Sequence, residues 1–321
     1  RDFCTFCCSA VRNRAPEATA AYRKNEGSPF RFRQKKPTFE NMPPPSGTPA
    51  ARRKTSTEKA MFDKQTYIAR RKALHAKLSG GLVLLPGNDE SPANYPGNTF
   101  RFRQDSTFLY FFGLNRPGCS GLLDLDSGED VLFGDDPTLE DIIWTGPQPS
   151  LAELAGEVGV EKTQSAAHLQ KRIEAAVAKG RKVHFLPPYR GETRSTMSRL
   201  LGIRADRLAS YASAELARAV VALREVKEPA EIEEIERACE TAGKMHRLAM
   251  RMCRPGITER EIAGAIEGVA LQHGAGVSFP SIVTQHGETL HNHDYDHVLQ
   301  SGRLMLIDAG AETAMNYCSD F

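Results

Sequence analysis

The sequence has 321 residues, enough for two domains and a core of substantial size. Apolar residues make up 40% of it and charged residues 26%, the balance of an ordinary soluble protein. No apolar run approaches the roughly 20 residues of a membrane span, and no signal-peptide pattern is visible. These features argue against a membrane protein.

The net charge of +2 hides an uneven distribution. Residues 1–60 contain 13 Lys or Arg and 5 Asp or Glu, whereas the rest of the chain contains 29 basic and 35 acidic residues. Because the larger part is mildly acidic, we expect no nucleic-acid partner.

Seven cysteines are scattered along the chain, apart from three in the stretch CTFCC near the start. No second CxxC or HxxxH accompanies that stretch, so a zinc site is not favoured there. Scattered single cysteines are typical of reduced thiols, and we expect a cytoplasmic protein.

Residues 1–60 are rich in Arg, Lys, Pro and Ser and lack apolar periodicity. This composition is typical of a disordered linker. An organelle transit peptide is an alternative. We favour a disordered or spurious extension, with the folded protein beginning at Met61.

Residues 61–213 alternate between helical and extended patterns. We expect helices and strands at 67–78 (helix), 81–87 (strand), 118–126 and 129–134 (paired strands), 150–160 and 166–180 (helices) and 182–188 (strand). Such alternation predicts an α/β domain with a largely parallel or mixed sheet and flanking helices.

Residues 225–321 place their helices before their strands, which predicts an α+β domain. Residues 214–224 predict a helix that precedes it, and Pro229 fits the first turn of the next one. That helix carries a core-facing apolar stripe of Ile232, Ile235, Ala238, Ala242 and Met245. A further helix is expected at 258–276, since Thr258 and Glu261 have capping-box spacing. Strands follow at 281–285, 304–310 and 312–320.

Two aspartates end apolar or aromatic runs near the end of the sequence. Asp308 follows LMLI, and Asp320 follows twelve residues later. If 304–308 and 312–320 form a hairpin, both carboxylates face one cavity, an arrangement that suits hard divalent cations. On spacing alone, a turn-capping Asp308 and a solvated Asp320 remain an alternative.

A histidine cluster, LHNHDYDH, precedes these aspartates and contains His291, His293 and His297. Loop histidines are often merely exposed to solvent. His291 follows a predicted strand and Leu290, so it is placed to point into the same cavity. Spacing alone does not separate it from His293.

Several stretches resemble the pita-bread metallopeptidases, and residues 61–321 look like an Xaa-Pro aminopeptidase (aminopeptidase P) with its creatinase-like N-terminal domain. SGRLMLIDAGAE followed by YCSD is similar to the family's metal-binding hairpin, and FPSIV with GETLH to the strand and turn before its active site. FRFRQDSTFLYFFGL is similar to an aromatic segment of the N-terminal domain. The resemblance implies an α/β domain at 61–213 and an incomplete pita-bread domain at 225–321.

Carried over to this sequence, the resemblance makes Asp308 and Asp320 metal ligands and His291 the histidine that contacts the substrate. His293 and His297 become bystanders. The implied cofactors are two divalent ions, usually Mn²⁺, with a bridging hydroxide that attacks the carbonyl before proline. The implied substrate is a peptide with an Xaa-Pro N-terminus, and the implied assembly is a homo-oligomer, a dimer or tetramer.

Two departures from the family pattern affect these expectations. The aspartates are twelve residues apart where eleven is commoner, and a bulge can absorb the extra residue. The other ligands of the family, a histidine and two glutamates, lie downstream of the second aspartate and are not in this sequence. We therefore expect a fragment that is inactive alone and binds metal weakly.

Four alternatives stay open to different degrees. A prolidase that cleaves Xaa-Pro dipeptides is the nearest, and the FRQDSTFLYFFG segment favours the aminopeptidase over it. A metal-free creatinase-like hydrolase or a non-catalytic peptide-binding module would not need both Asp308 and Asp320. A methionine aminopeptidase lacks a long α/β domain in front. The aromatic run from Phe108 to Phe112 is interpreted mainly as core, with an oligomer contact as the alternative.

Overall fold

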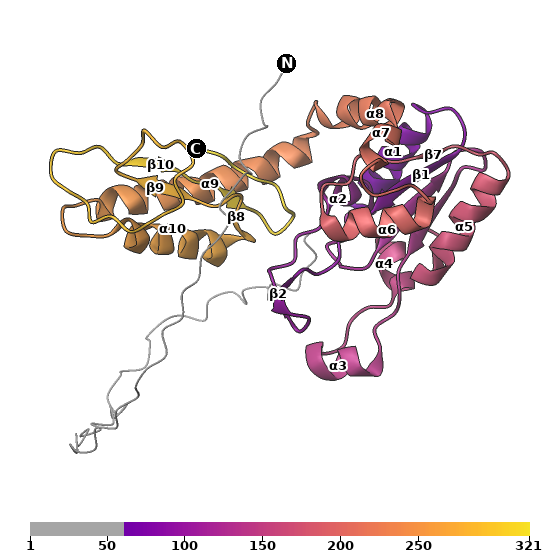
Figure 1. Ribbon diagram of the computed structural model, residues 1–321, viewed down its shortest axis with the longest axis horizontal. Coiled ribbons are helices and arrows are strands. Elements are labelled where there is room, and N and C mark those ends of the chain that lie inside the picture. Colours follow the sequence, from indigo (N-terminus) through magenta and orange to yellow (C-terminus); the bar gives the residue numbers. More distant parts are fainter. Residues whose placement is uncertain (1–60) are drawn as a thin grey trace, which may run out of the picture. The chain divides into compact units, whose positions relative to one another are not determined.

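The computed structural model describes residues 61–321, so the expectations for residues 1–60, including the CTFCC stretch, lie outside it. In residues 61–224 a sheet is surrounded by helices (Figure 1). Its helices are α1 (Lys64–His75), α2 (Ser106–Phe112), α3 (Leu139–Thr145), α4 (Leu151–Glu157), α5 (Ala166–Ala178), α6 (Gly191–Leu201), α7 (Leu208–Tyr211) and α8 (Ala214–Arg224). Its strands are β1 (Leu82–Pro86), β2 (Pro92–Tyr95), β3 (Asn98–Thr99), β4 (Ser120–Asp124), β5 (Glu129–Phe133), β6 (Lys162–Gln164) and β7 (Val183–His184).

Five of these strands form one mixed sheet in the order β6-β5-β4-β1-β7. The strands β1, β4 and β5 are antiparallel neighbours, while β7 and β6 pair in parallel with β1 and β5. The tight connection of β4 to β5 is the predicted hairpin. The mixed sheet with flanking helices therefore confirms the α/β expectation for this region.

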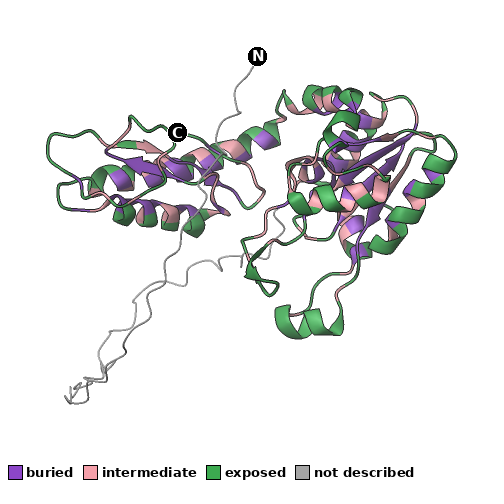
Figure 2. Cartoon of the chain, in the orientation of Figure 1, coloured by how far each residue is buried: buried purple, intermediate pink, exposed green. Residues whose placement is uncertain are grey.

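Alternating side chains of the sheet pack into two cores, one on each face. The strands of the sheet are accordingly coloured mainly as buried in Figure 2. Along β1, Val83 and Leu85 pack with α1, α2, α4 and α8. Leu82 and Leu84 point to the other face, toward α5, α6 and α7. Because both faces are covered, the strands read as continuous apolar runs in the sequence.

The rest of the described chain places two long helices in front of short strands. These elements are α9 (Pro229–Met252), α10 (Glu259–His273), β8 (Gly276–Val277), β9 (Ile282–Thr284), β10 (Leu306–Asp308) and β11 (Ala311–Glu312). As predicted, Pro229 occupies the first turn of α9, and Thr258 and Glu261 form a capping box at α10. A third core lies between these helices and strands.

The predicted apolar stripe of α9 is right for its later turns and wrong for its first. Ala238, Ala242 and Met245 are buried, but Ile232 is 46% exposed. In its place Glu231 and Glu234 are buried. The stripe fails there because the first turn of α9 faces polar partners from α1 and from the end of the chain, not the third core.

Within residues 61–321, none of the helices combines the length and the apolar character that crossing a membrane would need. Phe108, Phe111 and Phe112 lie on α2 and are fully buried. The aromatic run is thus core, as favoured above, and its buried rings are not available for a contact between subunits. The boundaries proposed at 213 and 225 stay a prediction.

Candidate metal centre

The strands that carry the candidate carboxylates pair differently from the expectation. β10 pairs with β9, and β11 pairs with β8, so 304–308 is not hydrogen-bonded to the stretch after 312. Of the predicted ranges 304–310 and 312–320, the strands cover only Leu306–Asp308 and the single residue Glu312, the end of β11 (Ala311–Glu312). The prediction of two long strands joined as one hairpin was wrong in this respect, because β10 and β11 are short and form separate two-stranded sheets with β9 and β8.

A narrower hairpin nevertheless joins residues 309–313 to residues 317–321, here called the aspartate hairpin. Ala309 N donates to Phe321 O (3.1 Å), Ser319 N to Ala311 O (3.0 Å) and Thr313 N to Tyr317 O (2.8 Å). A bridge pairs Glu312 with Cys318 in the same register. In this register Asp320 lies opposite Gly310.

The register places Asp308 and Asp320 on the same face. Side chains alternate along a strand, so Asp308 shares its face with Gly310, and Gly310 with the opposite Asp320. Diagonal neighbours of this kind lie about 7–8 Å apart at the backbone. The other face carries Ile307, Ala309 and Ala311, which pack into the third core.

The tip of the aspartate hairpin accommodates the extra residue between the aspartates. Asn316 N donates to Thr313 O (2.9 Å), and Asn316 adopts a left-handed backbone with φ of 63°. A turn followed by a left-handed residue is the usual three-residue hairpin loop with a bulge. Asparagine tolerates this conformation better than most residues.

The Asp308 carboxylate has one oxygen atom that could bind a metal ion. Its Oδ1 atom is buried and has no hydrogen-bond partner among the residues that the structure describes. A buried carboxylate oxygen without a partner is costly, and a divalent cation is one group that would satisfy it. Asp320 is exposed on the same face. The two carboxylates therefore fit a hard divalent ion in chemistry and in direction.

His291 makes no hydrogen bond or ion pair with Asp308 or Asp320 within residues 61–321. It is exposed in the loop between β9 and β10. Within residues 61–321 no three His, Cys, Asp or Glu side chains gather closely enough to hold a metal ion. The structure therefore unites two of the three predicted site residues on one face and leaves the third in a solvent-facing loop.

The loop that carries His291 is fixed at both ends by one buried acid, Glu259 of α10. Glu259 is fully buried and accepts hydrogen bonds from Gln285 N (2.8 Å) and from His297 Nδ1 (3.0 Å). Thr284 Oγ1 donates to it as well, at 3.2 Å. His297, named a bystander above, thus has a structural contact that the loop sequence did not reveal.

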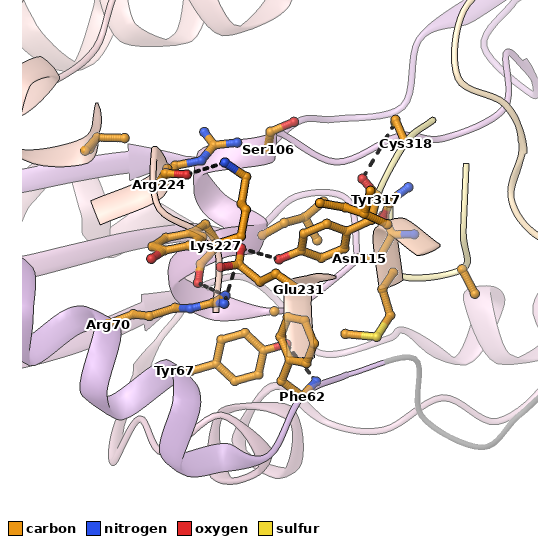
Figure 3. A pocket seen from close by; sticks show the side chains of 18 of the residues that line it. Phe62, Tyr67, Arg70, Ser106, Asn115, Arg224, Lys227, Glu231, Tyr317 and Cys318 are labelled. Atoms are coloured by element: carbon orange, nitrogen blue, oxygen red, sulfur yellow. Dashed lines mark hydrogen bonds and ion pairs between the residues drawn. The ribbon is translucent and has the colours of Figure 1, made fainter. Parts of the chain in front are cut away.

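A cavity of about 560 Å³ lies next to the tip of the aspartate hairpin, but it is not lined by Asp308, Asp320 or His291. Its wall consists of α1, α2, α8, the first turns of α9 and residues 314–318 (Figure 3). Tyr317 points across it toward Glu231, with Arg70 beyond (Figure 3). We do not assign the substrate to this cavity, because the candidate ligands lie at the opposite end of the aspartate hairpin.

The polar side chains in the cavity wall contact one another directly. Tyr317 Oη donates to Glu231 Oε1 (2.8 Å), and Arg70 Nη2 lies 3.5 Å from the same oxygen. Burial first, and the contact with the Glu231 carboxylate second, raise the pKa of Tyr317 far above its usual value. Tyr317 therefore remains a hydrogen-bond donor at any physiological pH.

Sequence reasoning missed these residues, although one signal was present. On α1 the buried positions are Tyr67, Arg70, Arg71 and Leu74. This is the i, i+3, i+4, i+7 spacing of a core-facing stripe, with two arginines in it. Charged residues in such buried positions indicate oppositely charged partners, which here are Glu228 and Glu231 for Arg70 and Asp130 for Arg71.

Comparisons with known proteins agree with the fold. The family model described as aminopeptidase P, N-terminal domain, matches residues 67–184, and the model of metallopeptidase family M24 matches residues 233–321. Together they match more than half of the chain.

Curated relatives carry related names. The chain is 27% identical over 258 residues to a probable Xaa-Pro aminopeptidase of Chaetomium globosum, covering 78% of this chain and 42% of the relative. It is 27% identical over 267 residues to the Xaa-Pro aminopeptidase of Escherichia coli, covering 78% and 59%. The chain therefore spans about half the length of the curated relatives that it matches.

Similar solved structures are also aminopeptidases P. Zn-substituted aminopeptidase P of Escherichia coli in complex with product matches with a TM-score of 0.69 and 25% identity, covering 81% of this chain and 62% of the other. Aminopeptidase PepP of Pseudomonas aeruginosa matches with the same TM-score at 24% identity, covering 81% and 61%, which supports the fold alone. The chain belongs to metallopeptidase family M24 and carries the N-terminal domain of aminopeptidase P in front of its M24 region.

Proposed function

We propose that the full-length protein is a metal-dependent aminopeptidase that releases the N-terminal residue from peptides with proline in the second position. The observation that carries the proposal is the buried, unpartnered Oδ1 of Asp308, on the face that it shares with Asp320. The names of the matched relatives supply the substrate class.

Asp308 and Asp320 would hold the divalent ions, for which we propose Mn²⁺. Two such ions supply a water of lowered pKa and polarise the scissile carbonyl. His291 would contact the substrate, and its exposed position leaves it accessible to a peptide. Glu259 would keep the loop of His291 anchored through Gln285 and His297.

Two carboxylates are too few for a tight dimetal site. Within residues 61–321 no third His, Cys, Asp or Glu side chain joins them closely enough to hold a metal ion, so we propose that further ligands complete the site. We therefore propose that the 321-residue chain alone binds Mn²⁺ weakly and does not turn over substrate. Robust Mn²⁺-dependent hydrolysis by this chain would contradict the proposal.

The test of the function uses the full-length protein and an Xaa-Pro-Xaa tripeptide, with release of the first residue followed at saturating Mn²⁺. Asp308→Asn should lower kcat by at least about 100-fold, since an amide is a poorer ligand for a hard cation than a carboxylate. Asp296→Asn, which alters an exposed acid of the neighbouring loop, is the matched control and should retain activity. No tripeptide cleavage by the wild type, or equal rates for both variants, would refute the assignment.

The same assay distinguishes a prolidase. An enzyme that prefers Xaa-Pro dipeptides over the tripeptide is a prolidase and not an aminopeptidase. The names of the matched relatives favour the aminopeptidase, so we expect cleavage of the tripeptide.

We also propose a homo-oligomer in the cytoplasm. The exposed apolar side chains of α3 support the assembly, because Leu139, Ile143 and Trp144 are at least 72% exposed. Free thiols at the four cysteines of the described chain are consistent with a reducing compartment. Cell fractionation of a tagged full-length protein tests the compartment, and recovery in an organelle fraction would refute it.

A further inference from the structure

The first arm of the aspartate hairpin is held by an arginine from the α/β region. Arg103 Nε donates to Glu312 Oε1 at 2.9 Å, and Arg103 Nη1 donates to Gln104 O and Ser106 Oγ, both at 2.7 Å. The Glu312 side chain is 9% exposed and the Arg103 side chain 37%, so the pair is partly buried, with the carboxylate on the protected side. An ion pair of this kind resists screening better than one on the surface.

Glu312 lies on the same face of the aspartate hairpin as the candidate ligands. It is two residues from Gly310 and four from Asp308, and side chains at even steps along a strand share a face. Arg103 therefore contacts this face at Glu312, two positions from Gly310, which is the residue that lies opposite Asp320. Arg101 adds a second contact, because a Cβ atom on Gly276 of β8 would lie 2.3 Å from its Nη1. β8 is the strand that pairs with β11.

The second arm is held through Tyr317, three residues before Asp320. Its hydroxyl donates to Glu231 Oε1, while Glu231 Oε2 accepts from Glu228 N (3.0 Å) to cap α9. Arg70 of α1 lies 3.5 Å from Glu231 and donates to Glu228 at 2.7 Å. Arg70 is 3% exposed and is further fixed by Tyr110 O (3.1 Å).

Both arms of the aspartate hairpin are thus attached to the α/β region, one by Arg103 and the other by Arg70 through Glu231 and Tyr317. The loop at the tip, residues 314–316, borders the cavity and is not packed into the third core. These polar contacts therefore have a larger share in fixing the tip than they would on a hairpin packed on all sides.

We propose that Arg103, and Arg70 acting through Glu231 and Tyr317, are positioning residues that set the separation of Asp308 and Asp320 and thereby the affinity of the metal site. The inference rests on the proposed function, since it assumes that these aspartates bind metal. It gives the N-terminal domain a role in metal binding within its own chain.

The test compares Mn²⁺ binding by the metal-free full-length wild type with that of Tyr317→Phe, Arg103→Gln and the double variant, by titration calorimetry. Tyr317→Phe removes only a hydroxyl, and the Arg103 side chain is 37% exposed, so both variants should fold. Arg172→Gln is the control for Arg103. It breaks the ion pair between Arg172 Nη2 and Glu129 Oε1 (3.0 Å), which belongs to the α/β region and not to the aspartate hairpin. Tyr189→Phe, which loses a hydroxyl contact with Asn88 Nδ2 at 3.5 Å in the α/β region, is the control for Tyr317.

We expect each single variant to bind Mn²⁺ about 10- to 100-fold more weakly than the wild type, as for other residues that orient ligands. The double variant should be weaker than either, and both controls should bind like the wild type. A purely structural role would lower the unfolding temperature without changing the affinity of the folded protein. Lys in place of Arg103, which keeps the charge, should restore part of the affinity.

Two results would overturn the inference, and they are distinguishable. If the wild type binds Mn²⁺ tightly and the variants bind equally well, the positioning role is wrong and the proposed function stands. If the wild type itself does not bind Mn²⁺, the proposed function fails and the inference fails with it.

Discussion

Gly310 occupies a point in the aspartate hairpin where no side chain fits. A Cβ atom there would lie 1.9 Å from Ser319 O and 2.3 Å from Ser278 Oγ. The first of these atoms belongs to the backbone of the opposite arm and cannot turn away. The glycine that follows Asp308 and Ala309 thus lets the two arms approach closely enough to place both aspartates on one face.

Gly310→Ala should therefore push the arms apart. We expect a loss of about 1–3 kcal/mol in the free energy of unfolding, as for other overpacked sites, and weaker Mn²⁺ binding by the full-length protein. Urea unfolding and calorimetry measure the two effects. Gly268→Ala on α10, where a Cβ atom meets nothing within 4 Å, should instead be stabilising by about 0.5–1 kcal/mol. Equal behaviour of the two variants would contradict the close-approach argument.

Among the helices of residues 61–321, α3 differs in having no buried residue. Its seven residues begin with a capping box formed by Thr138 and Asp141, and none of them is buried. Trp144 is 80% exposed and Ile143 72% exposed. A short helix that satisfies its backbone locally but leaves large apolar groups in solvent is typical of a surface that a partner covers.

If a second copy covers α3, charge inserted there should break the assembly. We expect Ile143→Lys combined with Trp144→Lys to shift the full-length protein to monomers in sedimentation velocity, because burying a lysine without a partner is costly. Val226→Lys, at an exposed valine between α8 and α9, should leave the mass unchanged. A wild type that sediments as a monomer, or a double variant that keeps its assembly, would exclude α3 as the contact.

Across the whole molecule, the fold depends on a few buried charges as well as on its three cores. Asp130 of β5 accepts from Arg71 Nε at 2.7 Å and from His75 Nε2 at 2.8 Å, which ties α1 to the sheet. Burial alone would raise the pKa of Asp130. The hydrogen bonds from His75 and Arg71 outweigh that effect, so its pKa in the folded protein lies below its usual value.

A carboxyl group whose pKa is lowered by folding stabilises the protein above its unfolded pKa of about 3.9, and this stabilisation is lost as the pH falls through the folded value. Asp130→Asn should therefore cost about 3 kcal/mol at pH 7, because it leaves Arg71 buried without its carboxylate. The difference from the wild type should shrink below about pH 4. Urea unfolding between pH 3 and 7 measures it, with the exposed Asp206→Asn as control. A difference that does not change with pH would show that the charge of Asp130 is unimportant.

The local sequence pattern was sufficient to predict most of the helices and strands. The continuous apolar run of β1, the Ser127-Gly128 turn between β4 and β5, Pro229 at the start of α9 and the capping box of α10 each depend on a few adjacent residues. α2 was harder to predict, because a helix buried among other elements shows no amphipathic period. β6 and α3 were missed for a related reason, since short elements carry few periods to detect.

The sequence singled out Asp308 and Asp320 as candidate ligands, first as acids at the ends of apolar or aromatic runs and then through the resemblance of their stretch to the family's metal-binding hairpin. Only the tertiary structure decided their register, through Gly310 and the left-handed Asn316. It alone also revealed that Arg103 contacts the aspartate hairpin at Glu312, 209 positions away, and that Arg70 contacts Glu231 of α9, 161 positions away, which in turn accepts a hydrogen bond from Tyr317 of the hairpin. Contacts between residues so distant in sequence leave no periodic signal, because they depend on how separately folded elements meet.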